Sequence, residues 1–305
     1  MLEYCQPPSS RRKGIMLCYP FEEKRLLKWP VPYLIQPKLD GERCRALFNA
    51  TGIVTLLSSE ENKIISVPHI NTALEALKLK NVELDGELYV HSMPFEEIHS
   101  RVSRKVNEHQ DSWQIEYHIF DIINEKRQTE RVIELHKLAE RFTSPLIEVA
   151  LRVALNLEDI MRLYDQFLEQ GYEGFILRHP HAPYVRTRST NIMKFKPKKE
   201  DYYRIVSYTE EMKMSYGEDV EHSYQKPNNS LGALILGSAH TIDRVNEFKV
   251  GTGFTADQRH ELWKIRDSLI GKIARIKYQH LTTSNHVPRF PVFVEIIEPN
   301  KIGAS

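Results

Sequence analysis

The chain has 305 residues, of which 41% are hydrophobic and 27% are charged, and its formal net charge is +1. That length suits one large domain or two ordinary ones. No stretch approaches the roughly 20 apolar residues that a membrane helix needs, and the near-neutral charge indicates no partner by itself. The three cysteines show no CxxC spacing, and the N-terminus lacks the apolar centre of a signal peptide. We therefore expect a cytoplasmic setting, without a structural zinc site, a disulfide framework or a membrane partner.

The first two thirds of the chain mix strand and helix patterns. Strands are expected at 33–35, 44–48, 51–58, 82–90, 114–124 and 174–178. Helices are expected at 68–79, 130–142 and 156–171. Asn156 is a candidate N-cap for the last of these helices, and Gly171 can end it. Asp-Gly pairs at 40–41 and 85–86 predict turns.

After about residue 202, short strands dominate. They are expected at 203–208, 231–237, 244–251, 272–280 and 290–297. Thr255 and Gln258 form a capping box that opens a helix between two of them, and the polar stretch 210–230 predicts a long loop. Five short strands with an inserted helix favour an OB-fold β-barrel. We predict an α+β chain of two domains: antiparallel sheets and helices over 1–202, and the OB-fold over 203–305.

The stretch "PKLDGER" brings Lys38, Asp40 and Arg43 together. Alone, it fits a solvated β-turn as well as a reactive lysine. Five further positions follow it in order: Glu87, Phe120, Glu173, Lys194 and Lys196. Each has an ordinary explanation when taken singly, as a solvent-facing strand residue, a core aromatic, a connector or a solvated basic face. Their order after the lysine makes these separate explanations hard to sustain together.

In this order the motifs resemble those of the covalent nucleotidyltransferases: ATP-dependent DNA ligases, RNA ligases and mRNA capping enzymes. The segments "LGALIL", "FKVGTGFTADQRHELW" and "VPRFPVF" are similar to the OB domain of small ATP-dependent DNA ligases, including viral ones. The resemblance implies an enzyme that seals nicks in duplex DNA through a covalent lysyl-AMP and an adenylated 5′-phosphate. Because no separate N-terminal DNA-binding domain is recognised, we expect a minimal ligase of viral or accessory bacterial type.

Three other functions share some of these features. An RNA ligase, or another polynucleotide 5′-phosphate ligase or capping enzyme, would share the first step. An inactive nucleic-acid-binding module is disfavoured because the charged motifs are intact. An NAD-dependent ligase is disfavoured because three scattered cysteines cannot build its four-cysteine zinc module.

The resemblance assigns the chemistry of the first step. Lys38 would attack the α-phosphate of ATP, for which its amine must first lose a proton, since free lysine has a pKa of about 10.4. Asp40 belongs to the same catalytic motif, and Lys194 and Lys196 would neutralise phosphate charge. Glu87 and Glu173 would supply hard oxygens to Mg²⁺ or Mn²⁺.

The nucleotide contacts also follow from the resemblance. Phe120 would stack on the adenine, Ile176 would cover its other face, Gln36 would lie at its edge, and Arg43 would contact the ribose. Ser59 stands where relatives usually carry an arginine, so one contact is absent or supplied elsewhere.

Nicked DNA needs a basic surface. The candidates are Arg101, Arg104, Lys105, Arg186, Arg188, Lys198, Lys199, Lys249, Lys277 and Arg289.

The final motif of the family is incomplete here, with Lys301 or Arg289 as weak substitutes for its missing basic residue. We expect a monomer whose second domain swings about 198–202, and whose 210–230 loop helps to grip the duplex.

Overall fold

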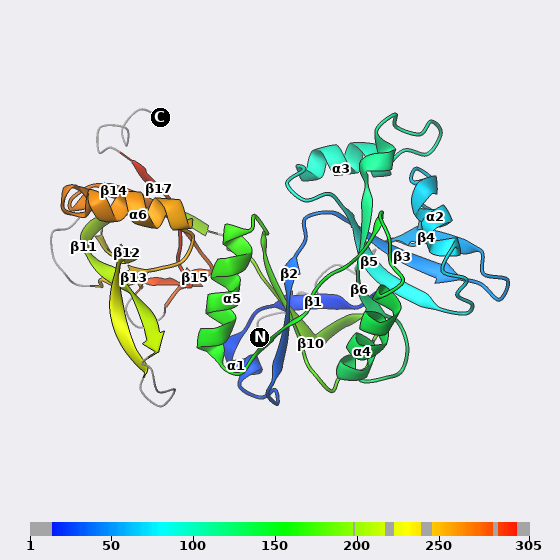
Figure 1. The fold of residues 1–305 in the computed structure, drawn as a ribbon, viewed down its shortest axis with the longest axis horizontal. Helices are drawn as coiled ribbons and strands as arrows, with labels where there is room; N and C mark the ends of the chain where they lie inside the picture. The colour runs from blue at the N-terminus through cyan, green and yellow to red at the C-terminus, as the bar shows by residue number, and fades with distance from the viewer. Residues whose placement is uncertain (1–13, 198, 217–222, 239–245, 283–285, 298–305) are drawn as a thin grey trace, which may run out of the picture. The chain divides into compact units, whose positions relative to one another are not determined.

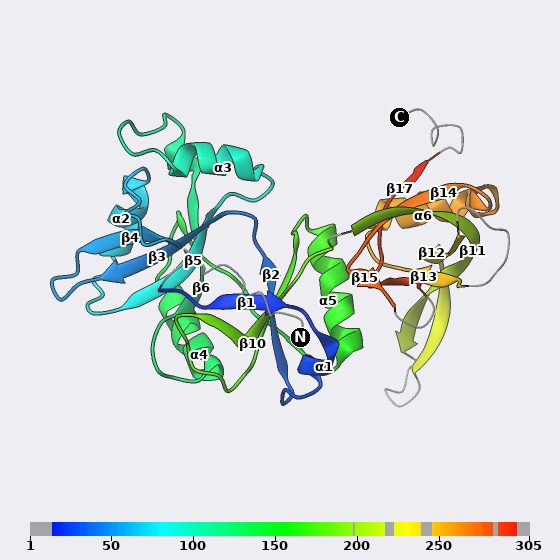
Figure 2. The same cartoon turned by 180° about the vertical axis from the view of Figure 1, so that it is seen from behind.

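The computed structural model describes residues 14–197, 199–216, 223–238, 246–282 and 286–297. Two compact units are present, Met1–Phe195 and Lys196–Ser305. Both units are drawn in Figures 1 and 2. The predicted boundary at 202–203 lies within strand β11 (Lys199–Tyr216) and stays a prediction. Over the described ranges, no helix combines the length and the apolar character needed to cross a membrane.

The first unit contains two five-stranded sheets. In the first sheet the order is β1 (Leu17–Pro20), β10 (Arg188–Phe195), β9 (Gly174–Arg178), β2 (Tyr33–Lys38) and β8 (Arg152–Ala154). Only the β1–β10 pair is parallel in this sheet. The short helix α1 (Glu23–Leu26) follows β1.

One face of the first sheet is covered by helix α5 (Leu157–Glu169). The rings of Phe175 and Phe195 stack with centroids 4.9 Å apart, and Tyr164 of α5 meets both rings edge-on. The helix begins where predicted, because the Asn156 side chain accepts a hydrogen bond from the backbone N–H of Asp159 at 2.8 Å. The helix therefore fills one face of the sheet and leaves the opposite face available for polar side chains.

In the second sheet the order is β4 (Val54–Ser58), β3 (Glu42–Phe48), β5 (Glu83–Tyr89), β6 (Glu116–Ile122) and β7 (Leu146–Glu148). Helices α2 (Pro68–Glu75), α3 (Phe95–Val102) and α4 (Gln128–Ala139) pack against its strands. A 3₁₀ turn, η1 (Ser112–Gln114), precedes β6.

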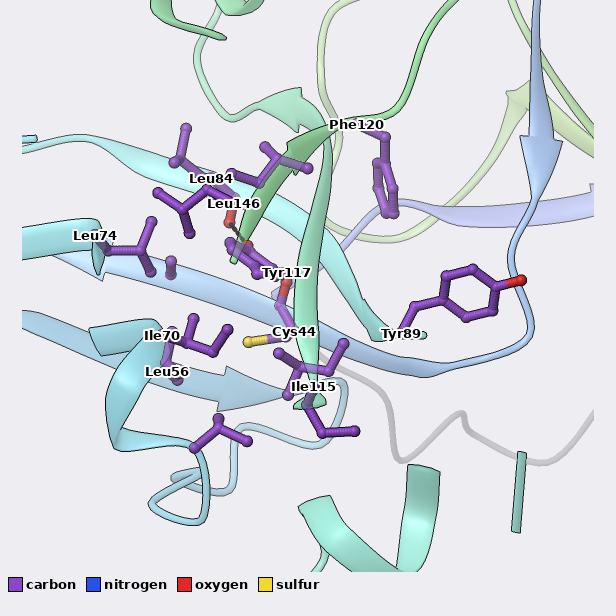
Figure 3. Packing of buried hydrophobic residues seen from close by; sticks show 14 of the residues in the cluster. Cys44, Leu56, Ile70, Leu74, Leu84, Tyr89, Ile115, Tyr117, Phe120 and Leu146 are labelled. Carbon is purple, nitrogen blue, oxygen red and sulfur yellow. Dashed lines mark hydrogen bonds between the residues drawn. The ribbon is translucent and has the colours of Figure 1, made fainter. Parts of the chain in front are cut away.

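The core of the second sheet is mainly aliphatic (Figure 3). Tyr117 is fully buried there, and its hydroxyl donates to the carbonyls of Cys44 at 3.0 Å and Leu84 at 3.2 Å. Phe120 and Tyr89 lie at the edge of the group of side chains that Figure 3 draws. Phe120 is therefore placed where one side of its ring can serve a neighbouring site.

Two predicted turns differ from the structure. Asp85 and Gly86 lie inside the continuous strand β5, with only a bulge at this point, so the turn predicted there is wrong. Asp40-Gly41 does connect two strands, but β2 and β3 belong to different sheets, so the connection is not a hairpin. A Cβ on Gly41 would collide with the carbonyl oxygen of Leu88, which explains why glycine is needed at this crossing.

The second unit is built on a sheet with the order β13 (Phe248–Val250), β12 (Ser223–Ser238), β11, β14 (Ile273–Tyr278) and β17 (Val292–Ile297). The pair β15 (His280–Leu281) and β16 (Pro288–Arg289), helix α6 (Ala256–Lys264) and the turn η2 (Arg266–Leu269) complete the described part. The predicted capping box is confirmed: Thr255 N–H donates to Gln258 Oε1 at 2.9 Å, and Gln258 N–H donates to Thr255 Oγ1 at 3.1 Å.

The predicted OB-fold is consistent with this arrangement, although the described strands do not form a continuously closed barrel. The two edges of the sheet meet through one isolated bridge between Thr252 and Val292. Gly253, next to this bridge, has a φ of +95°, and a Cβ there would lie 2.5 Å from the carbonyl oxygen of Phe293. The rings of Phe254 and Phe293 stack 4.2 Å apart beneath the bridge.

The polar stretch 210–230 is not a long loop. Most of it extends β11 and β12 as an antiparallel pair, with partners running from Met212–Pro227 to Tyr216–Ser223. Residues 217–222 lie outside the described ranges. The polar composition fits a two-stranded ribbon in water, because both of its faces can stay solvated.

Candidate active site

Four of the predicted site residues share one face of the first sheet. Lys38 is the register partner of Gly174, Gln36 is the partner of Ile176, and Ile176 is the partner of Lys194. Side chains of direct partners, and of residues two apart on a strand, point to the same side. Gln36, Lys38, Ile176 and Lys194 therefore face away from α5 together.

The second sheet supplies a complementary set of charges. Arg43 is the partner of Glu87 across β3 and β5, and Asp85 is the partner of Asp121 across β5 and β6. Arg178 of the first sheet donates from Nη1 to Asp121 Oδ2 at 3.0 Å. This buried bond shows that the polar faces of the two sheets meet.

Lys38 lies at the meeting point. Its Nζ donates to Glu173 Oε2 and, at 3.3 Å, to the backbone carbonyl of Leu39. The lysine and the glutamate are both mostly shielded from solvent. A carboxylate partner stabilises the ammonium form, which cannot act as a nucleophile. The structure thus shows the Lys38 amine engaged by Glu173 and by the Leu39 carbonyl.

Glu87 is the second carboxylate near this lysine. Burial raises its pKa to about 8, and the positive charges of Arg43 and Lys38 oppose that rise only in part. When burial raises the pKa of a carboxyl group, a cation bound next to it stabilises the ionised form and lowers the pKa again. Glu87 lies on β5 of the second sheet, and Glu173 directly precedes β9 of the first sheet, so the two carboxylates approach Lys38 from different sheets.

These two carboxylates fit the expected divalent cation. In the portion of the chain that is described, no cluster of three or more His, Cys, Asp or Glu side chains could hold a metal ion. Mg²⁺ is usually bound by only one or two carboxylates, with waters and substrate phosphates completing its octahedron. A pair of glutamates would thus be a sufficient protein contribution, if phosphates of the nucleotide lie beside Lys38.

Arg43 is fixed by a buried carboxylate. Its Nε and Nη2 donate to the two oxygens of Asp85 at 2.7 and 2.6 Å, and Asp85 is fully buried. Burial alone would lower the pKa of Arg43, but Asp85 outweighs that effect and raises it well above its usual value. Tyr184 also donates its hydroxyl to Asp85 and accepts from the Met16 N–H at 3.0 Å. The guanidinium expected at the ribose is therefore charged and preorganised.

Gln36 is more constrained than the sequence indicated. It is 3% exposed, its Nε2 donates to the Val149 carbonyl at 3.0 Å, and its Oε1 accepts from Arg178 Nε at 2.8 Å. Both ends of the amide are thus engaged within the protein. The guanidinium carbons of Arg43 and Arg178 lie 4.6 and 5.2 Å from the ring centroid of Phe120. Gln36 and Phe120 both contact Arg178, and these three side chains form one fixed wall of the site.

Other predicted site residues are placed less centrally. Asp40 is exposed in the crossing between the sheets. Ser59 follows Ser58, the partner of Cys44, in the turn after β4. Lys196 comes directly after β10 and begins the second unit. Their roles stay predictions.

Four residues of this site were missed from the sequence: Asp85, Arg131, Arg178 and Tyr184. A usable signal existed for two of them. Asp85 and Arg178 are charged residues within apolar strand patterns, and a charged residue in a buried strand needs a partner. Arg131 and Tyr184 gave no such signal, because a charged helix residue and a loop tyrosine are usually on the surface.

The predicted DNA-contacting residues have varied surroundings. Arg186 pairs with Glu83, and Lys277 pairs with Glu200, so these two carry partly neutralised charge. Arg188 lies over the ring of Tyr19. The remaining described candidates lie in α3 or after it, in β11, in β13 and in β16: Arg101, Arg104, Lys105, Lys199, Lys249 and Arg289. Lys198 and Lys301 lie outside the described residues.

Comparison with known sequences identifies the same two parts of the chain. Residues 15–196 match the ATP dependent DNA ligase domain, and residues 224–296 match the DNA ligase OB-like domain. A DNA ligase of Haemophilus influenzae is 26% identical over 285 residues, covering 92% of this chain and 90% of that protein. The DNA ligase of African swine fever virus (strain Badajoz 1971 Vero-adapted) is 29% identical over 192 residues. That match covers 58% of this chain but only 44% of the viral protein, so the chain spans less than half of that relative.

Solved structures agree in fold. The ATP-dependent DNA ligase from bacteriophage T7, in complex with ATP, has a TM-score of 0.67 at 16% identity and covers 93% of this chain and 98% of its own. Chlorella virus DNA ligase-adenylate has a TM-score of 0.61 at 23% identity, with the same coverage of both chains. Because the catalytic-domain match spans more than half of the sequence, the chain belongs to the ATP-dependent DNA ligase family.

Proposed function

We propose that this chain is a DNA ligase that uses ATP to seal nicks in duplex DNA through a covalent Lys38–AMP intermediate. The observation that carries the proposal is the contact between Lys38 and Glu173, at the line where two polar sheet faces meet. A lysine in that position, with Lys194 on β10 of the same sheet and Glu87 on β5 of the other sheet, would have the partners that adenylyl transfer needs.

In the first step the Lys38 amine attacks the α-phosphate of ATP. A nitrogen–phosphorus bond forms, and the bond to the departing pyrophosphate breaks. Nζ must first lose a proton to solvent and give up its contact with Glu173. Lys194 lies two strands away on the same face, and it would neutralise charge on the α-phosphate.

Glu87 and Glu173 would hold Mg²⁺ or Mn²⁺. When bound, such a cation would neutralise phosphate charge and favour the unprotonated amine. Because Glu173 is also the contact of Lys38, its use as a metal ligand would free the Lys38 amine.

In the later steps AMP passes to the 5′-phosphate at a nick, and the adjacent 3′-hydroxyl displaces AMP. Asp40 lies in the exposed crossing two residues after Lys38, and it would act in these later steps. Phe120, Ile176, Gln36 and Arg43 would hold the adenosine throughout.

Covalent labelling tests the first step. The protein is incubated with Mg²⁺ and ATP labelled on its α-phosphate, and the adduct is resolved by denaturing electrophoresis. We expect labelled protein from the unsubstituted chain and from the control Lys80→Ala, which removes an exposed lysine. Lys38→Ala should give no adduct. An adduct of undiminished yield on Lys38→Ala would show that another residue is the nucleophile.

Sealing assays test the acceptor. Nicked duplexes with DNA or RNA strands are supplied with ATP or with GTP, and the joined strand is measured on a gel. We expect joining of the DNA nick with ATP. Joining of RNA nicks alone would instead support the RNA ligase reading.

The monomeric state, the cytoplasmic location and the role of 210–230 in gripping DNA also stay predictions. Sedimentation velocity tests the first of these. Deletion within 210–230 tests the last, since unchanged affinity for a nicked duplex would contradict that role.

A further inference from the structure

Arg131 lies in α4, outside every motif used above, and it is among the largest side chains that are fully buried. Its Nε donates to Asp121 Oδ1 at 2.8 Å, and its Nη2 donates to Asp121 Oδ2 at 3.2 Å. Nη2 also donates to Gln128 Oε1 at 2.6 Å. A buried guanidinium that is satisfied in this way is rigid, because moving it would leave charged groups unpaired in a dry interior.

The carboxylate that Arg131 fixes is shared with the candidate site. Asp121 Oδ2 also accepts from Arg178 Nη1, and Arg178 Nε donates to Gln36 Oε1. The order of contacts is thus Arg131, Asp121, Arg178 and Gln36. Two guanidinium groups share one carboxylate, so the position of each depends on the other.

The same arginine holds a second part of the wall. Its Nη1 donates to the Ala182 carbonyl at 3.1 Å, and its guanidinium carbon lies 5.7 Å from the Tyr184 ring centroid. Tyr184 in turn contacts Asp85, the carboxylate that orients Arg43. Arg131 therefore connects to both guanidinium groups that lie near Phe120, whose ring stands at the edge of the hydrophobic cluster in Figure 3.

We infer that Arg131 is a positioning residue for the base-binding side of the ATP site, acting through Asp121 on Arg178 and Gln36. This inference rests on the proposed function. Without Arg131, Asp121 is free to form a two-bond pair with Arg178, which would draw Arg178 Nε away from Gln36. The Gln36 amide would then lose the donor that fixes its orientation, and discrimination at the edge of the base would weaken.

The test measures adduct formation by the full chain at varied ATP. For Arg131→Met we expect the KM for ATP to rise about tenfold, the effect of losing one charge-assisted contact. The preference for ATP over GTP should fall with it. The fraction of protein labelled at saturating ATP should stay close to that of the unsubstituted chain. A merely structural role would lower that fraction and leave the KM unchanged.

A matched control is Arg45→Met. Arg45 is also a buried arginine, but it pairs with Glu83 and Glu61. This variant should lose stability while its KM stays within about twofold of the unsubstituted value. Arg131→Lys, which keeps the charge and one donor, should give an intermediate KM. If Arg131→Met does not fold, the KM of Arg131→Lys tests the inference. If neither variant folds, the test uses Gln128→Leu, which removes one acceptor of Arg131.

A double-substitution cycle with Arg178→Met identifies the route. If Arg131 acts through Arg178, the double variant should have nearly the KM of Arg178→Met alone. Folded Arg131 variants with an unchanged KM, or effects that simply multiply, would overturn the inference. Failure of the unsubstituted chain to form any adduct would instead remove the proposed function, so the two failures are distinct.

Discussion

Tyr184 donates its hydroxyl to Asp85, a residue 99 positions earlier in the chain. The bond joins the segment between β9 and β10 to strand β5 of the other sheet. It is buried at both ends, and the same carboxylate holds Arg43.

We predict that Tyr184→Phe lowers the free energy of unfolding by about 1–3 kcal/mol, because Asp85 loses a donor and the Met16 N–H loses its acceptor. Tyr164→Phe is the matched control. Its hydroxyl is also buried and, over the described chain, has no hydrogen-bond partner. That variant should be neutral or slightly more stable. Equal losses in urea denaturation would contradict the importance of the Tyr184 bond.

We predict that Arg43→Lys is more destabilising than Arg45→Lys, although both residues lie on β3. Arg43 makes a two-bond fork with Asp85, whose geometry an ammonium group cannot reproduce. We expect a loss of about 2–4 kcal/mol for Arg43→Lys and about 1 kcal/mol for Arg45→Lys. Thermal and urea unfolding of both variants provide the measurement, and a reversed order would refute this reading of the fork.

The raised pKa of Glu87 predicts a pH dependence of stability. The folded chain keeps a proton on Glu87 up to about pH 8, whereas the unfolded chain releases it near 4.5. Between these values the folded state binds more protons, so this group's contribution to stability is complete below pH 4.5 and is lost as the pH rises toward 8. Glu87→Gln should therefore gain stability relative to the unsubstituted protein from pH 5 to pH 8.5, by about 4 kcal/mol at most. The free energy of unfolding is measured against pH for both proteins, without added nucleotide or metal. Parallel curves for Glu87→Gln and the unsubstituted protein would contradict the raised pKa of Glu87.

Two glycines of the second unit separate steric collision from backbone strain. Gly253 and Gly271 both have positive φ, but a Cβ at Gly271 would meet nothing within 4 Å. Gly271→Ala should cost about 1 kcal/mol from backbone strain alone. Gly253→Ala should cost at least ~3 kcal/mol, because its Cβ would also strike the Phe293 backbone at the bridge between the sheet edges. If the two variants lose similar free energies of unfolding, the backbone around the bridge can shift to accommodate the added Cβ, which would contradict this prediction.

Local signals in the sequence predicted much of the fold. The cap at Asn156 and the box at Thr255 and Gln258 were sufficient to place the starts of α5 and α6, because capping depends only on near neighbours. Asp85-Gly86 misled the turn prediction. The pair normally favours a turn, but here the strand continues through a bulge against β6.

The candidate site, too, could be predicted only in part from the sequence. The charged residues of the motifs were identified from their order, but their hydrogen-bond and ion-pair partners were not. Lys38 meets Glu173 across 135 positions, and Arg178 meets Asp121 across 57. Such pairings are decided by which sheet each strand joins, and a local pattern carries no information on that choice. The hydrogen bonds of Gln36 to Val149 and Arg178 were beyond prediction for the same reason.

The connection between β2 and β3 sets a length as well as a direction. Lys38 ends a strand of one sheet and Glu42 begins a strand of the other, with only Leu39, Asp40 and Gly41 between them. This segment is a spacer of fixed length between the amine proposed to react and the guanidinium proposed to contact the ribose. Adding one residue would shift every side chain of β3 to the opposite face, turning Arg43 away from Asp85 while leaving all the chemical groups present. The spacing within the motif is therefore as much a part of the catalytic apparatus as the residues themselves.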